Sequence, residues 1–155
     1  MANTYTQLYI HYVFAVWNRL SMINHEWESE LYKYITGVVN EQGHKLYAIN
    51  GVADHIHVLV SMSPKQAPSD LMYHVKRCSS LWVNKNRLAR GKFFWQEGFG
   101  AFSYGKSQIP MIANYIGKQK QHHKKQTFFK EYVGFLDAYG IEYDEKYLYK
   151  PLDGC

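Results

Sequence analysis

The chain has 155 residues, 46% of them hydrophobic, and a formal net charge of +5 at pH 7. This length suits one compact domain with its own core, so we expect a single domain over residues 1–155. No apolar run is long enough for a transmembrane helix, and the N-terminus lacks the pattern of a secretory signal. We therefore expect a cytoplasmic protein without a membrane partner, whose Cys78 and Cys155 are free thiols.

The first half of the chain predicts a strand, a helix and two further strands. Residues 5–17 are rich in Tyr, Val and Phe, as is typical of a strand buried on both faces. A helix with an apolar stripe is predicted from Asn24, as its N-cap, to about Gln42. Residues 45–50 predict the second strand, and the sequence Asp-His-Ile-His-Val-Leu-Val at 54–60 predicts the third.

The second half predicts one more strand among several helices. A helix starts at Pro68, extended segments follow at 93–95 and 99–103, and Ser107 caps another helix. A last amphipathic helix covers about 127–139. This order predicts an α+β fold: a ferredoxin-like or RRM-like βαββαβ antiparallel sheet with helices on one face and an added C-terminal helix.

The third strand carries the first chemical signal. Side chains alternate across a strand, so His55 and His57 share one face while Ile56 and Val58 share the other. Two imidazoles on one face are a common start of a metal site, although such histidines also serve as polar or stacking residues. If the apolar row packs under helices, the histidines face the open side of the sheet.

The helix after Ser107 brings further polar groups to the edge of a buried face. At about 100° per residue, its isoleucines form one apolar stripe. Tyr115, Gln119 and His122 fall together on a neighbouring stripe. The spacing therefore allows a phenol and an amide, or a further imidazole, to lie near the histidine face.

The paired sequences at 54–60 and 115–119 resemble the single-tyrosine HUH transposases of the insertion-sequence 200/605 family, with their relatives associated with repetitive extragenic palindromes. The similarity covers the first strand to about His123, within an expected core of about 5–125. By this resemblance His55 and His57 are metal ligands, Gln119 is the third ligand and Tyr115 is the nucleophile. On spacing alone, His122 remains an alternative to Gln119.

The resemblance also implies a reaction, a cofactor and partners. It implies an enzyme of a bacterial or archaeal cell that uses Mg²⁺ or Mn²⁺ to cleave and rejoin single-stranded DNA next to hairpins, through a 5′-phosphotyrosine. It implies a homodimer, in which the tyrosine helix of one subunit can complete the site of the other. The predicted DNA contacts are one histidine of the first strand and a set of basic side chains: His11, Lys76, Arg77, Lys118, Lys120, Lys124 and Lys125. A solvated helix face would show the same basic residues, and His11, on the histidine face of a central first strand, would otherwise support the site or simply pack there.

Other functions compete with this interpretation. A histidine-triad hydrolase needs a third histidine at the position of Leu59, which argues against that class. A basic pI of about 9.1 and 17% aromatic residues also suit a non-catalytic RRM-like nucleic-acid-binding protein. A larger replication initiator or relaxase would share the chemistry, and a domesticated nuclease that processes palindromes would share the sequence.

Overall fold

The computed structural model describes residues 4–123 and 127–142, which form an α+β fold built on one antiparallel sheet. Its four strands lie in the order β2-β3-β1-β4, which confirms the expected βαββαβ arrangement. The elements in chain order are β1 (Tyr9–Ala15), η1 (Trp17–Arg19), α1 (Glu28–Glu41), β2 (Lys45–Val52), β3 (His55–Ser61), α2 (Pro68–Lys85), β4 (Gly100–Tyr104), η2 (Lys106–Gln108), α3 (Ile109–Gly117), α4 (Gln119–His122) and α5 (Phe128–Ala138).

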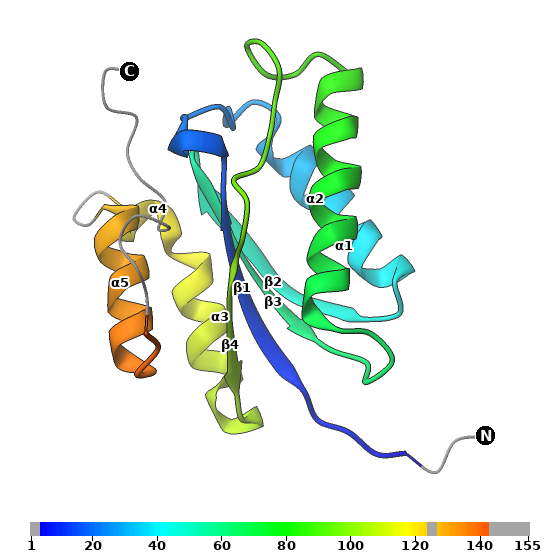
Figure 1. Cartoon of the computed structure of the whole chain (residues 1–155), viewed down its shortest axis with the longest axis vertical. Coiled ribbons are helices and arrows are strands. Elements are labelled where there is room, and N and C mark those ends of the chain that lie inside the picture. The colour runs from blue at the N-terminus through cyan, green and yellow to red at the C-terminus, as the bar shows by residue number, and fades with distance from the viewer. Residues whose placement is uncertain (1–3, 124–126, 143–155) are drawn as a thin grey trace.

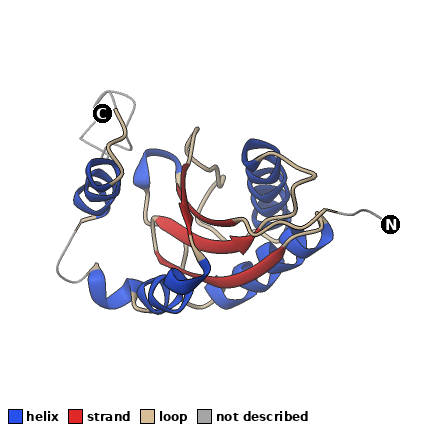
Figure 2. Ribbon diagram, turned by 90° about the horizontal axis from the view of Figure 1, so that it is seen from below, coloured by secondary structure: helices blue, strands red, loops and turns tan. Residues whose placement is uncertain are grey.

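The two faces of the sheet pack against different helices. On one face, Phe14 of β1 and Ile56 and Val58 of β3 join residues of α1 and α2 in the main core, as the alternation along the third strand predicts. On the other face we expected an open surface, but α3, α4 and α5 cover it (Figures 1 and 2). Because these helices carry apolar residues such as Ile116 and Phe128 onto the sheet, the histidine face is buried.

The strand register brings a third histidine to this covered face. Ala15 pairs with His55, Val13 with His57, and His11 with Leu59 in the antiparallel ladder of β1 and β3. Directly opposed residues point to the same side of a sheet. His11 therefore shares the face of the two β3 histidines, one strand away.

Several element boundaries differ from the sequence expectations. The first strand begins only at Tyr9, and α1 begins at Glu28 because residues 24–27 form a turn, in which Asn24 Oδ1 accepts from the Glu26 amide at 2.8 Å. Ser107 is not a cap, since η2 precedes α3 there. An Asx-type turn competes with helix at such positions, which explains the late start of α1.

The tyrosine helix is divided in two. Its first part, α3, ends at Gly117, and α4 begins at Gln119 after a break at Lys118. The carbonyl of Gly117 accepts a hydrogen bond from Asn50 Nδ2 of β2 at 3.0 Å, and glycine weakens a helix. The hydrogen bond from Asn50 and the low helix propensity of glycine both act at Gly117, where α3 ends. Tyr115 and Gln119 therefore lie on different helices.

The C-terminal helix forms where the sequence predicts it. Thr127 caps α5 by accepting from the Lys130 amide at 3.2 Å, and Gly140 follows with a φ of +64°. Cys78 is a free thiol, while Cys155 lies outside the described residues. No helix in the ranges 4–123 and 127–142 combines the length and apolar character that crossing a bilayer demands.

Gly51 is required by a close approach within the β2–β3 hairpin. A Cβ atom at this position would collide with the carbonyl oxygen of His55 and would lie 2.9 Å from the Ile56 Cα. Gly51→Ala is therefore expected to lower the free energy of unfolding by about 1–3 kcal/mol, measured by urea denaturation. Gly37→Ala in α1, where nothing lies within 4 Å, is the matched control. We expect that control to be neutral or to gain up to about 1 kcal/mol; equal losses in both variants would contradict the close-approach explanation.

Candidate active site and metal centre

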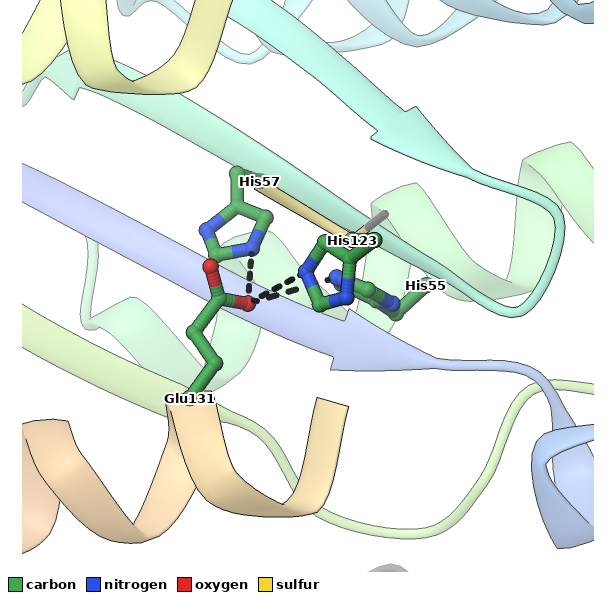
Figure 3. Close-up of side chains that lie close together, drawn as sticks. All are labelled: His55, His57, His123 and Glu131. Carbon is green, nitrogen blue, oxygen red and sulfur yellow. Dashed lines mark hydrogen bonds and ion pairs between the residues drawn. The ribbon is translucent and has the colours of Figure 1, made fainter. Parts of the chain in front are cut away.

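Glu131 of α5 stands at the centre of the covered face (Figure 3). Its Oε1 atom lies 3.0 Å from His57 Nε2, 3.0 Å from His123 Nε2 and 3.4 Å from His55 Nε2. The two strand histidines are fully buried, and Glu131 is 3% exposed. One carboxylate oxygen thus gathers three imidazoles from β3 and from the segment after α4.

The second oxygen of Glu131 accepts hydrogen bonds from side chains of the two helices that follow β4, α3 and α4. The Tyr115 hydroxyl donates a hydrogen bond to Glu131 Oε2, and Gln119 Nε2 donates to the same atom at 3.3 Å. The predicted nucleophile, the two predicted histidine ligands and the predicted third ligand therefore meet around one carboxylate. They do so within a single chain, although helix α3 ends before Gln119.

Neighbouring side chains fix the orientation of both strand histidines. His55 Nδ1 donates to Asp54 Oδ1 at 2.7 Å, which directs Nε2 toward Glu131. The carboxylate of Glu131 only accepts, so His57 Nε2 carries a proton and His57 Nδ1 accepts from His11 Nε2 at 2.7 Å. In this tautomer His57 Nε2 is a donor, so binding a metal through Nε2 requires its proton to move to Nδ1, where His11 Nε2 can accept it.

Burial and hydrogen bonds shift the pKa values of these histidines in different directions. Burial lowers the pKa of His57 to about 4, and burial with the neighbouring His57 lowers the pKa of His11. Burial also opposes charge on His55, but the hydrogen bond to Asp54 and the Glu131 carboxylate 3.4 Å from Nε2 outweigh it and raise that pKa. His57 and His11 are therefore neutral at pH 7, so a metal that binds His57 has no imidazolium charge to displace.

The carboxylate and the phenol have opposite proton affinities. Burial alone would raise the pKa of Glu131, but hydrogen bonds with His123 and His57 and the close contact with His55 lower it well below its usual range. Burial and the hydrogen bond to Glu131 raise the pKa of Tyr115. The proton between these two residues therefore rests on the phenol.

The donor set fits a divalent metal ion. One ligand atom from each of His55, His57, His123 and Glu131 lies within 4.8 Å of all the others. The separations of about 3 Å between Glu131 Oε1 and the imidazoles match neighbouring ligands of one ion, because bonds of about 2.1 Å at right angles place ligands roughly 3.0 Å apart. Gln119 Oε1 is buried without a hydrogen-bond partner in the described part of the chain, so it offers a further oxygen.

Comparison with known proteins identifies the family. A family model described as "Transposase IS200 like" matches residues 4–119, about three quarters of the chain. The chain belongs to the IS200-like transposases. No curated protein matched the chain.

Two solved structures share the fold of this IS200-like transposase. One is a putative transposase from Deinococcus radiodurans R1, with a TM-score of 0.61 and 17% identity, covering 77% of this chain and 95% of that one. The other is a REP-associated tyrosine transposase bound to a REP hairpin, with a TM-score of 0.60 and 14% identity, covering 79% of this chain and 73% of that one. At these identities the likeness concerns the fold alone.

Two members of the site were not anticipated from the sequence of this transposase. His123 and Glu131 belong to the group, whereas His122, the alternative ligand, stacks on the Tyr115 ring with centroids 4.6 Å apart. The break at Lys118 shifts the register, so that His123 rather than His122 turns toward Glu131. The sequence does contain a signal for Glu131, because this acidic residue lies within the apolar stripe of the last helix.

The predicted DNA contacts divide into buried and exposed residues. His11 is fully buried, so the structure places it among the residues that hold His57 rather than on a surface that DNA could reach. Lys76 donates to the carbonyls of Gln96 and Gly98, and burial lowers the pKa of Lys76 to about 8. The Lys76 ammonium group therefore stabilises the loop before β4 through these two hydrogen bonds.

The remaining predicted contacts are basic side chains outside the core. Arg77 and Lys118 are exposed, and Lys120 is exposed but pairs with Glu28 at 3.1 Å. Lys124 and Lys125 lie outside the described residues. The DNA roles of all these side chains stay predictions.

Proposed function

We propose that this transposase cleaves and rejoins single-stranded DNA next to hairpins, with Tyr115 as the nucleophile and a divalent metal ion at the histidine group. The observation that carries the proposal is the meeting of the Tyr115 hydroxyl with His55 and His57 on the two oxygens of Glu131. Membership of the transposase family supports the same reaction class.

His55, His57, His123 and Glu131 would hold the ion, with Gln119 as a further candidate ligand. When bound, the ion supplies positive charge against a phosphate oxygen at the cleaved bond. Nitrogen ligands suit first-row transition metals better than Mg²⁺, which prefers oxygen. Of the two ions that we predicted, we therefore propose Mn²⁺.

Tyr115 forms a bond from its phenolic oxygen to phosphorus as the bond from phosphorus to the 3′ oxygen breaks. The phenolic proton passes to Glu131 Oε2, which already accepts its hydrogen bond. The pKa of Glu131 is low and that of Tyr115 is high, so the free phenol does not give up its proton to Glu131. The transfer becomes favourable as the bond to phosphorus forms, because the phenolic oxygen then loses its basicity. The 3′ oxygen takes a proton from water, the hydroxide that this leaves takes the proton held on Glu131, and the products are a 5′-phosphotyrosine and a 3′-hydroxyl.

The substrate and assembly belong to the proposal as well. The REP-associated relative is described with a REP hairpin, and the basic character of this chain also favours a DNA hairpin with single-stranded flanks as partner. The Tyr115 hydroxyl donates to the Glu131 carboxylate that the histidines of the same chain surround, which supports an attack by Tyr115 within its own subunit. The expected homodimer, in the cytoplasm of a bacterial or archaeal cell, remains a prediction.

The covered sheet argues against the main alternative. An RRM-like protein stacks bases on an open sheet face, whereas here α5 packs over β1 and β4 with Phe128 and Leu136. A domesticated nuclease that processes palindromes would use the same residues as a mobile transposase. The DNA that flanks the gene distinguishes these two histories.

Covalent capture of DNA tests the proposed function. Purified protein with Mn²⁺ and a labelled single-stranded oligonucleotide, covering an inverted repeat that flanks the gene, is expected to give a labelled band of protein size on a denaturing gel. EDTA and His57→Ala are each expected to reduce this band at least about a hundredfold, because charge stabilisation at such centres is worth that much or more. The fully double-stranded form of the oligonucleotide is the control. A band that survives both EDTA and His57→Ala would rule out the metal role.

A further inference from the structure

A second binding region lies beside the metal-ligand group. A cavity of about 1140 Å³ is lined by His123 and Phe128, next to the site, and also by Arg19 and Arg90. Sites for small molecules usually measure roughly 300–1,000 Å³. The cavity therefore has room for an extended ligand that passes close to the candidate active site.

The lining of this cavity is strongly basic. Its basic residues are Arg19, Arg90, Lys120 and Lys130. Both carboxylates that line it are already engaged: Glu28 pairs with Lys120, and Asp54 accepts from His55. The other three basic side chains form no ion pair in the described part of the chain. Burial lowers the pKa of Arg19 and the Asp54 carboxylate opposes that shift, so Asp54 offsets part of the Arg19 charge. The charges of Arg90 and Lys130 are available to an anion.

The backbone that carries Arg19 is held in an unusual conformation. Asn18 and Arg19 have φ values of +51° and +53°, in the left-handed region that residues other than glycine seldom adopt. The Asn18 amide donates to Gln96 Oε1 at 3.0 Å, and the Arg19 amide donates to the Val16 carbonyl at 2.8 Å. Such strained residues, fixed by their surroundings, often mark ligand-binding positions.

The Arg19 side chain reaches toward the candidate active site with an unused donor. Arg19 Nε is buried and has no hydrogen-bond partner among residues 4–123 and 127–142. The guanidinium carbon lies 5.7 Å from the centre of the Phe128 ring, and that ring lies 4.3 Å from the His55 ring. One aromatic ring therefore separates this cation from a predicted metal ligand.

Exposed aromatic rings near Arg19 favour a nucleic acid over a small anion. Trp17, two residues before Arg19, is 48% exposed and Phe94 is 46% exposed; their rings pack edge to face outside the lining of the cavity. Lys92 Nζ lies 5.0 Å from the centre of the Phe94 ring. Basic side chains beside aromatic faces are typical of surfaces that bind unpaired bases by stacking.

We propose that this cavity binds the single-stranded flank of the DNA substrate, and that Arg19 donates to a backbone phosphate of that flank. The inference rests on the proposed function and adds the path by which the strand reaches the metal-ligand group. Arg90 and Lys130 supply further phosphate contacts along the cavity.

Salt-dependent binding of two probes tests this site. The probes are the gene-flanking hairpin with its single-stranded flank and the same hairpin trimmed at its base, each fluorescently labelled for anisotropy. Arg19→Gln is expected to weaken binding of the flanked probe about tenfold and to reduce the slope of log K against log salt by about 0.7, the value for one phosphate of a single strand. Binding of the trimmed probe is expected to stay within twofold, and Arg19→Lys is expected to restore most of the slope.

Two further variants keep the result decisive. Arg90→Ala, at an exposed loop position, is expected to reduce the flanked-probe slope without affecting the fold. Lys33→Ala removes one exposed charge from α1, outside the cavity, and serves as the control for net charge. Equal effects of Arg19→Gln, Arg90→Ala and Lys33→Ala would overturn the site, as would equal losses for both probes or displacement of the flank by millimolar inorganic phosphate. If wild-type protein forms the covalent adduct and these variants still match the control, the cavity assignment fails while the proposed function stands. If wild-type protein neither binds the probes nor forms the adduct, both fail.

Discussion

Replacing Tyr115 with phenylalanine is expected to abolish the covalent adduct with single-stranded DNA. The substitution removes one oxygen atom, which is the atom proposed to bond to phosphorus, and leaves the ring that stacks on His122. Removing a catalytic nucleophile typically lowers the rate by up to about 10⁶-fold, so a loss of at least about a thousandfold is expected here. Transfer of label from the oligonucleotide to the protein on a denaturing gel measures it.

Tyr104→Phe is the matched control for this change. Tyr104 ends β4, and its ring lies 6.2 Å from that of His11, so the control removes the same atom from a phenol on the same face of the sheet. We expect it to retain the adduct. Thermal unfolding should show that both variants are folded, and binding of the uncleaved oligonucleotide should persist in Tyr115→Phe. An adduct of normal yield in Tyr115→Phe would mean that another residue is the nucleophile.

The sheet could be predicted because its information is local. Alternation of apolar and polar residues in residues 54–60 fixes which side of β3 packs on α1 and α2, and the order of elements fixes the antiparallel arrangement. The cover over the histidine face could not be predicted in the same way. The apolar stripe of α5 indicates that the helix is buried, but no local pattern tells which surface it covers.

The candidate site, too, could be predicted from local sequence only in part. His55 and His57 were identifiable from strand alternation, and Tyr115 from helical spacing together with the family resemblance. Glu131 falls three residues after Phe128 on the stripe that α5 buries, and a charge on a buried stripe needs a compensating partner. This signal indicates that a partner exists. Only the packing of α5 against the sheet identifies that partner as the histidine group.

The division of the tyrosine helix had a non-local cause. A continuous helix would keep Tyr115, Gln119 and His122 on one stripe, and that pattern favoured His122 as a ligand. Asn50 of β2 donates a hydrogen bond to the carbonyl of Gly117, and α4 begins as a separate helix in the next turn. Because the hydrogen bond comes from a strand 67 residues earlier, spacing along the helix could not reveal that His123 would occupy the site.

Removing the Glu131 carboxylate is expected to cause the largest loss of stability of any single substitution at this site. In Glu131→Ala, the Nε2 donors of His57 and His123, the Tyr115 hydroxyl and the Gln119 amide all lose their acceptor in a buried setting. Breaking a buried charged network by removing one partner costs about 3–5 kcal/mol. Urea denaturation in the presence of EDTA measures this loss as the difference between the free energies of unfolding of the metal-free proteins. Glu30→Ala, which removes an exposed carboxylate paired with Lys33, is expected to change stability by no more than about 1 kcal/mol.

Adding Mn²⁺ to the same two proteins separates a ligand role of Glu131 from a purely structural one. An ion at 100 times its dissociation constant stabilises the folded state by about 2.7 kcal/mol. If the carboxylate is a ligand, wild-type protein gains this stability, whereas Glu131→Ala gains measurably less because three imidazoles remain without the oxygen. Glu131→Gln keeps the side-chain length, so we expect it to recover part of the stability lost in EDTA and little of the response to Mn²⁺. A larger Mn²⁺ response in Glu131→Ala than in wild type would mean that the carboxylate takes the position of the ion, and it would contradict the assignment of Glu131 as a ligand.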